Sequence, residues 1–262
     1  MKGKTGVFGM ITLLAFGMLA GEANTSQEGQ RAQMQRLIEQ EGGVVTRATA
    51  GGVIRVVLAT DRIDGNAVAP TVRQMQGLLD RAVELGKMPP AGTFQETVGA
   101  AWRVPGTTIA IVVLEDGILP SVVVAPEQGW AVVNVTALAA DSPKPELLAD
   151  RARKELWRAL VWTLAESHET GCVMRHATNL KELDEVTTQV PSPDPMFRLV
   201  CGVSRRKLRS IVRATYRDAC EEGWAPAPTN DVQKAIWEKV QADKERGPTN
   251  PIKIEPPKKN VK

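Results

Sequence analysis

Short runs of apolar, largely β-branched residues alternate with longer amphipathic segments between residues 44 and 164, and this alternation constrains the fold most. The segment 107–116 (TTIAIVVLED) has the composition of a buried strand, and 121–138 (SVVVAPEQGWAVVNVTAL) that of two strands around residues 126–129. Strands that alternate with helices are typical of layered α/β or α+β structures. We therefore predict a mixed β-sheet packed by helices, with a helical C-terminal part.

Three segments before this sheet core also have a predicted structure. The polar segment 26–40 is expected to be a helix, and residues 44–61 two strands joined as a hairpin around Gly51 and Gly52. Residues 69–86 are expected to form a helix, since Pro70 suits a first helical turn and Gly86 suits a C-cap.

The second half of the chain is predicted to be largely helical. A long amphipathic helix is expected from Lys144 to about Ser167. It is followed by a short helix at 179–186, a loop from Pro191 to Pro195, and helices Ser204–Glu222 and Asp231–Arg246. The helix at 204–222 would carry several basic side chains, which suit a solvated face or an anionic polymer (Arg205, Arg206, Lys207, Arg209, Arg213 and Arg217).

The two ends of the sequence differ in character from the middle. Lys2 and Lys4 precede an apolar run from Val7 to Leu19 and then small residues, the pattern of a secretory leader. Cleavage is expected after Ala23, with Ala20 as the second choice and an uncleaved anchor as the alternative. We expect a signal peptide at 1–23, one globular domain at 24–245 and a disordered Pro- and Lys-rich tail at 246–262. The chain is then secreted or periplasmic, with no membrane span in its mature part.

Composition narrows the classes of partner. The net charge of +3 over 262 residues is too small to indicate a nucleic-acid partner. Six tryptophans stand beside one tyrosine and four phenylalanines. Some of these indoles suit carbohydrate stacking, although most are expected to anchor the core.

Several local patterns leave chemical alternatives open. His168, Cys172 and His176 are spaced by four residues, which on a continuous helix would align them for a metal, and Cys172 with His176 also suits a nucleophile pair. The expected structural role is a partly buried histidine and two non-ligating residues. Four carboxylates near strand ends would suit an unrelated active site, or else are solvated loop residues (Asp61, Asp64, Glu115 and Asp116).

The order of features after the strands resembles that of a known peptidase family. A long helix is followed by His168, by Cys172–Met174, by NLKELD at 179–184, and by Cys201 shortly before RRKL at 205–208. This order, over roughly residues 107–208, resembles the archaemetzincins, which are metzincin zinc metallopeptidases. Their helix carries H-E-x-x-H-x-x-G-x-x-H, in which the histidines bind zinc, the glutamate activates water, and a methionine turn follows.

The resemblance implies where the family's site falls in this chain, and most of the expected residues are absent. Only the third histidine position (His168) and the turn methionine (Met174) match. The first histidine, the glutamate, the second histidine and the glycine fall at Arg158, Ala159, Trp162 and Ala165.

A second zinc site of the family would fall on Cys172 and Cys201, with Glu169 and Ser204 at the other two cysteine positions. Because two ligands of one zinc converge, the resemblance predicts that a Cys172–Cys201 disulfide replaces this site in the exported protein. Cys220 is expected to remain a buried free thiol.

The missing ligands imply a metzincin-like fold without its chemistry. One histidine cannot replace the three protein ligands of a catalytic zinc, and Ala159 cannot activate water. The expectation is a secreted pseudopeptidase, which would act as a non-catalytic binding or structural protein of the cell envelope and would need no cofactor. A zinc metallopeptidase with unusual ligands, or an unrelated enzyme, is the alternative. Extended peptide is the expected partner, at an edge strand near Ser121–Val124 or Gly129–Thr136.

Overall fold

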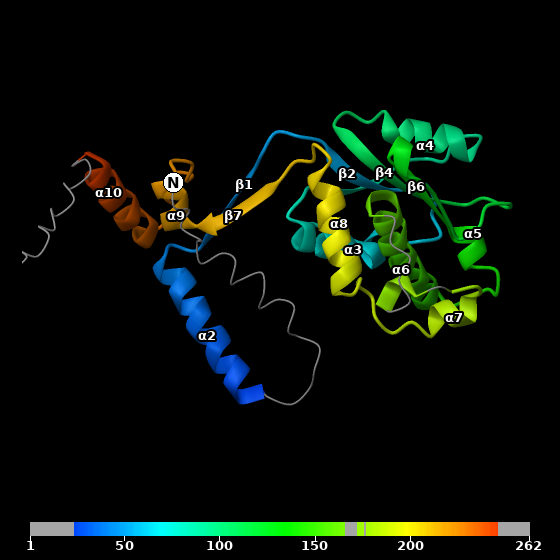
Figure 1. The fold of residues 1–262 in the computed structure, drawn as a ribbon, viewed down its shortest axis with the longest axis horizontal. Coiled ribbons are helices and arrows are strands. Elements are labelled where there is room, and N and C mark those ends of the chain that lie inside the picture. The colour runs from blue at the N-terminus through cyan, green and yellow to red at the C-terminus, as the bar shows by residue number, and fades with distance from the viewer. Residues whose placement is uncertain (1–23, 166–171, 176, 246–262) are drawn as a thin grey trace, which may run out of the picture. The chain divides into compact units, whose positions relative to one another are not determined.

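The computed structural model describes residues 24–165, 172–175 and 177–245 (Figure 1). The predicted leader, the C-terminal tail, His168, Glu169 and His176 lie outside the described residues. The chain divides into two compact units. The larger unit is Ala48–Val212, and the smaller combines the residues up to Arg47 with those from Arg213 onward.

A five-stranded mixed sheet forms the centre of the larger unit, with strand order β3-β2-β4-β6-β5. The pairs β2–β3, β2–β4 and β4–β6 are parallel, and only β5 runs antiparallel, along the edge of β6. This is the mixed α/β fold class predicted from the sequence. The strands are β2 (Val53–Leu58), β3 (Val83–Lys87), β4 (Thr107–Leu114), β5 (Val122–Ala125) and β6 (Trp130–Asn134).

Helices cover both faces of this sheet. Successive side chains of β4 point to opposite faces, so the apolar run is buried on both sides. Ile109 and Ile111 pack into the core of α3 (Gly65–Leu79) and α6 (Pro145–Leu164), whereas Ala110 and Val112 pack toward α4 (Phe94–Trp102). The α6 face carries the predicted site.

Short elements complete the larger unit. The turn η2 (Pro126–Gln128) joins β5 to β6, and α5 (Val135–Leu138) follows β6. After α6 come the turn η3 (Cys172–Met174), α7 (Leu180–Asp184) and α8 (Pro193–Ser204). The predicted long helix and the short helix capped by Asn179 are thus both present, with the Asn179 side chain accepting from the Glu182 N–H.

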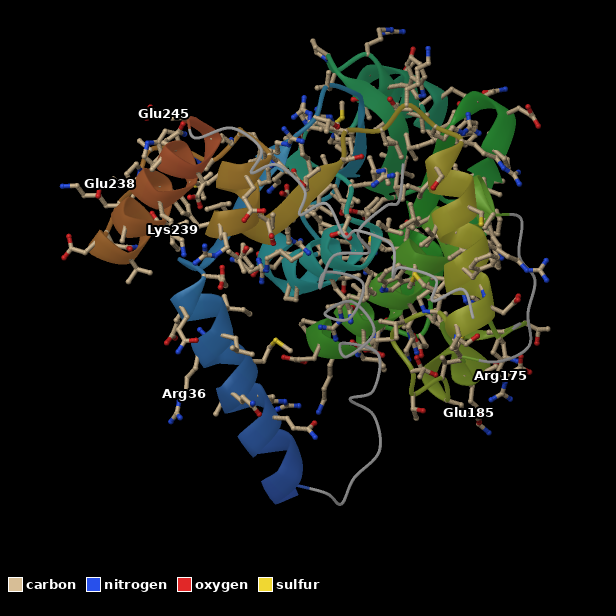
Figure 2. The ribbon with its side chains drawn as sticks, turned by 60° about the vertical axis from the view of Figure 1, so that its left-hand side comes forward. Arg36, Arg175, Glu185, Glu238, Lys239 and Glu245 are labelled. Atoms are coloured by element: carbon tan, nitrogen blue, oxygen red, sulfur yellow. The ribbon has the colours of Figure 1, made fainter. Side chains whose placement is uncertain are left out.

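The smaller unit has its own small core. Tyr216 is fully buried there with Cys220, Ile236 and Val240, and its hydroxyl donates to the Pro226 carbonyl at 3.0 Å. Glu238, Lys239 and Glu245 are exposed and labelled on α10 in Figure 2. The elements are α2 (Asn24–Gln40), β1 (Val44–Ala48), β7 (Ile211–Thr215), α9 (Tyr216–Glu221) and α10 (Asp231–Glu245), with β1 and β7 paired in a two-stranded sheet.

Two predictions for the first half were wrong. The strands on either side of Gly51 and Gly52 do not form a hairpin, because β1 pairs with β7 while β2 pairs with β3 and β4. The helix expected to reach Gly86 ends at Leu79, where Asp80 takes a left-handed conformation with φ of 49°. The chain then turns, and Gly86 lies within strand β3.

Two predictions for the second half were also wrong. The expected loop at Pro191–Pro195 contains the start of helix α8, since Pro193 occupies a first-turn position where a missing N–H costs nothing. The expected helix at 204–222 is instead strand β7 followed by the short helix α9. The β-branched residues Ile211, Val212 and Thr215 favour this strand.

Candidate functional site

Arg158 is the central residue of the predicted site, and its side chain is only 3% exposed. It lies on α6, and its Nε donates to the carbonyl of Val173 at 2.8 Å. Its Nη2 donates to the carbonyl of Arg175, whose own side chain is exposed (Figure 2). The guanidinium therefore ties α6 to the turn that contains Met174.

Glu155 is the buried counter-ion of this guanidinium. Its Oε1 lies 3.1 Å from Nη1 of Arg158 and accepts from the Ser121 hydroxyl at 3.4 Å. Its Oε2 has no hydrogen-bond partner in the described part of the chain. Burial raises the pKa of Glu155, and the charge and hydrogen bond of Arg158 offset this only in part.

The other residues of the predicted site lie close to this pair but are apolar. Ala159 is fully buried in the main core, and Met174 is 2% exposed in the same core. Trp162 packs partly buried against that core, with its ring centroid 6.0 Å from the Arg158 guanidinium carbon. Ala165 ends α6. The structure thus brings together Arg158, Trp162 and Met174, and none of these three residues belongs to the types that bind zinc in proteins.

The position of Arg158 does not fit a zinc ion. A guanidinium has five donors and no lone pair to offer, and it stays positively charged at all relevant pH values. Here its donors already reach the carbonyls of Val173 and Arg175 and the carboxylate of Glu155. A divalent cation beside it would meet a fixed positive charge. No cluster of three or more histidine, cysteine or acidic side chains suited to a metal occurs among the described residues.

The cysteines are free thiols in the structure. Cys172 Sγ accepts a hydrogen bond from the Ser192 N–H at 2.9 Å, and Cys201 lies half-buried on α8. The predicted Cys172–Cys201 disulfide is therefore not formed here, and Cys172 holds the start of α8 through its sulfur instead. Cys220 is a buried free thiol, as expected, and burial raises the pKa of its thiol.

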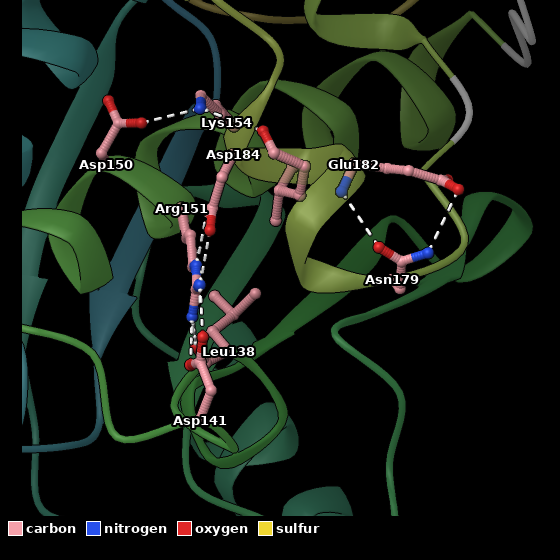
Figure 3. Close-up of polar contacts among 9 residues, drawn as sticks. Leu138, Asp141, Asp150, Arg151, Lys154, Asn179, Glu182 and Asp184 are labelled. Atoms are coloured by element: carbon pink, nitrogen blue, oxygen red, sulfur yellow. Dashed lines mark hydrogen bonds and ion pairs between the residues drawn. The ribbon is translucent and has the colours of Figure 1, made fainter.

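A second buried cation on α6 was missed by the sequence analysis (Figure 3). Arg151 is 1% exposed, and its guanidinium contacts the carboxylates of Asp141 and Asp184, each with a shortest distance of 2.6 Å. It also donates to the Leu138 carbonyl at 2.7 Å. Its hydrogen bond lowers the pKa of Asp141. The sequence contained one sign of this cluster, because the charged residues at positions 151, 154, 155 and 158 lie on one face of the predicted helix.

The strand-end carboxylates have structural partners. Each of the four accepts a hydrogen bond or forms an ion pair, either within its own loop or with a neighbouring segment, which favours the structural interpretation over an unrelated active site. The contacts are Asp61 to Lys87 at 2.6 Å, Asp64 to the Asn66 N–H at 3.0 Å, Glu115 to the Thr60 hydroxyl at 2.5 Å, and Asp116 to the N–H groups of Ile118 and Leu119 at 2.8 and 2.9 Å.

The predicted basic helix does not exist as one surface. Arg205 and Arg206 follow α8, and Arg206 Nη2 donates to the Pro126 carbonyl at 3.1 Å in the larger unit. Arg217 lies on α9 in the smaller unit, where it pairs with Glu41. The basic residues are thus divided between the two units.

The sheet has its antiparallel edge next to the site. Strand β5 occupies that edge, whereas β6 lies between β4 and β5. Of the two edge segments expected to bind peptide, Ser121–Val124 therefore lies at the edge and Gly129–Thr136 does not. Ser121 also bonds to Glu155, so the edge strand contacts the buried ion pair on α6.

Comparison with known proteins adds a likeness of fold. No family model matches the sequence, and no curated protein matches it. The chain is similar in fold to solved structures of zinc-dependent peptidases, and the archaemetzincin of Methanopyrus kandleri is one of them. That similarity has a TM-score of 0.49 at 18% identity and covers 59% of this chain and 97% of the other.

Two further structures show a weaker likeness. A zinc-dependent peptidase from Methanocorpusculum labreanum has a TM-score of 0.42 at 15% identity, covering 56% of this chain and 100% of the other. The archaemetzincin of Archaeoglobus fulgidus has a TM-score of 0.41 at 13% identity, covering 56% and 99%.

None of the helices in the described part of the chain is both long enough and apolar enough to cross a membrane.

Proposed function

We propose that this chain is an exported metzincin-like pseudopeptidase, a non-catalytic binding or structural protein of the cell envelope. One observation carries the proposal: the buried guanidinium of Arg158 occupies the place that the resemblance gives to the first zinc ligand. It binds the Met174 turn directly through main-chain carbonyls. The guanidinium thus links α6 to this turn without a metal.

The neighbouring side chains support the loss of peptidase chemistry. Catalytic zinc sites use three protein ligands and an open position for water. Ala159, at the position of the general base, carries no group that moves a proton, and it is fully buried. Trp162, at the position of the second histidine, packs against the core. Neither residue supplies a ligand or a base.

Export and a role in the envelope are supported by the sequence pattern of residues 1–23. A basic start, an apolar run and small residues form a leader of the secretory type. Fractionation of cells that express the full chain tests this step. Mature protein that begins at Asn24 in the extracytoplasmic fraction is the expected result, and full-length protein retained in the cytoplasm would contradict it.

The edge strand β5 supports a binding role. An edge strand exposes main-chain donors and acceptors that pair with an extended peptide, and this pairing requires no catalyst. We propose that peptide binds along Val122–Ala125. Amide chemical-shift changes on addition of an extended peptide should map to this strand. Changes confined to residues 205–217 would count against it.

The alternative, a zinc peptidase with unusual ligands, rests on the spacing of His168, Cys172 and His176. A peptidase assay separates the two candidates. The pseudopeptidase proposal expects no activity that a chelator abolishes, in the wild type or in His168→Ala. Chelator-sensitive cleavage that disappears in His168→Ala would establish the alternative instead.

A further inference from the structure

An aromatic pocket lies on the opposite face of the sheet from Arg158. It has a volume of about 310 Å³, at the lower end of the range for small-ligand sites. Helix α4 and the segment around the turn η2 form it, and the α4 core is separate from the core that contains α6. Its lining consists of Phe94, Gln95, Val98, Gly99, Trp102, Gln128 and Trp130.

Gln128 holds the two tryptophans of this pocket in place. Its main-chain carbonyl accepts from Nε1 of Trp102 at 3.1 Å, and its side-chain Oε1 accepts from Nε1 of Trp130 at 2.7 Å. Both indole N–H groups are thereby used within the protein. The rings are preorganised, so a ligand that stacks on them does not have to order them first.

From these contacts we infer that the pocket binds a neutral oligosaccharide. No lining residue is charged, which disfavours ionic ligands. The apolar faces of sugar rings pack on aromatic rings, and their hydroxyls pair with amides. Here the Nε2 amide of Gln128 and the amide of the exposed Gln95 supply those polar groups beside three aromatic side chains.

The same contacts disfavour a proline-rich peptide, which also docks in aromatic grooves. Such a peptide presents carbonyls that need donors from the groove. The two indole N–H groups, which would be the natural donors, are engaged by Gln128. The ring surfaces remain for stacking, and stacking on a flat sugar ring requires no indole donor.

Titration of the mature protein with cellohexaose, followed by tryptophan fluorescence and calorimetry, tests the inference. Trp102 is 43% exposed, so Trp102→Ala should fold normally and should weaken binding about tenfold, as expected for loss of one stacked ring. Gly99→Leu should also weaken binding by filling the pocket. A Cβ at Gly99 meets only the end of the Arg103 side chain, at 3.4 Å.

The matched control is Phe197→Ala, which removes an aromatic side chain that is 68% exposed on α8 and should leave the affinity unchanged. Three results would each overturn the inference. These are no binding of cellohexaose or chitohexaose at millimolar concentration, equal loss in Phe197→Ala and Trp102→Ala, and tighter binding of an oligoproline peptide or of hexagalacturonate than of the neutral sugars.

Discussion

The guanidinium of Arg158 and the carboxylate of Glu155 form an ion pair inside the protein, with 3.1 Å between Nη1 and Oε1 and 3% and 2% of their side chains exposed. Desolvating two charges costs free energy that their attraction does not always recover. The guanidinium of this pair also donates to two main-chain carbonyls around Met174. Its stabilising role is therefore best measured by removing one partner at a time.

Arg158→Met should lower the free energy of unfolding by about 3–5 kcal/mol, because it leaves Glu155 buried without its counter-ion. Urea unfolding followed by circular dichroism measures the loss. The matched control is Arg153→Met on the same helix, whose pair with Asp150 is partly solvated and should cost at most about 1 kcal/mol. Equal losses in the two variants would contradict a special role for Arg158.

Stability should depend on pH through Glu155. Its folded-state pKa is raised above the ordinary value of 4.5, chiefly by burial, so the folded chain holds this proton more tightly than the unfolded chain. The stabilisation is fully present below pH 4.5 and is lost as the pH rises through the raised pKa. Glu155→Gln keeps a neutral group and should remove this loss.

The measurement for Glu155 is the difference in unfolding free energy between wild type and Glu155→Gln across the pH range. The wild type should lose stability relative to the variant as the pH rises above 4.5. The prediction would be contradicted if this difference in unfolding free energy did not change with pH, or if it grew in favour of the wild type. Either result would show that burial does not raise the pKa of Glu155.

Arg151→Met should destabilise the larger unit more than the loss of an exposed ion pair does. The guanidinium of Arg151 is the shared partner of Asp141 and Asp184, and both carboxylates lose it together. Arg198→Met, which removes an exposed i,i+4 pair with Asp194 on α8, should cost about 0.5 kcal/mol at most. Similar chemical-denaturation midpoints for the two variants would show that the contacts of Arg151 with Asp141 and Asp184 stabilise the fold no more than an exposed ion pair does.

The close contact of α6 with α8 depends on Gly202. A Cβ added there would lie 2.0 Å from the Leu164 carbonyl oxygen, so Gly202→Ala should force the helices apart and lower the melting temperature. Gly77→Ala is the matched control within helix α3, where nothing lies within 4 Å of the new Cβ. Gly77→Ala should raise the free energy of unfolding by about 0.5–1 kcal/mol. The two glycine-to-alanine changes are therefore expected to shift stability in opposite directions.

The sheet could be predicted because its strands are buried on both faces. The continuous apolar run 107–114 and the two short runs around 126–129 match β4, β5 and β6 as observed. Periodicity failed where the partner of a segment is distant in sequence. The strand β1 pairs with β7, which follows more than 160 residues later, so a local hairpin was the wrong inference.

The candidate site could be predicted only in part. The resemblance located Arg158 and Met174, but the sequence analysis did not predict that Arg158 forms a buried ion pair with Glu155. Local spacing places Glu155 beside Arg158 on α6. It does not reveal the carbonyl partners of Arg158 around the η3 turn, or the partners of Arg151 on α7 and before α6. The aromatic pocket also joins distant segments, at 94–102 and 128–130.

The most direct test of the account is the zinc content of the purified mature protein, measured by elemental analysis after expression in zinc-supplemented medium. Because Arg158 places a fixed positive charge at the first ligand position, we predict far less than one zinc per chain, unchanged in His168→Ala. One zinc per chain in the wild type, lost in His168→Ala, would contradict the account.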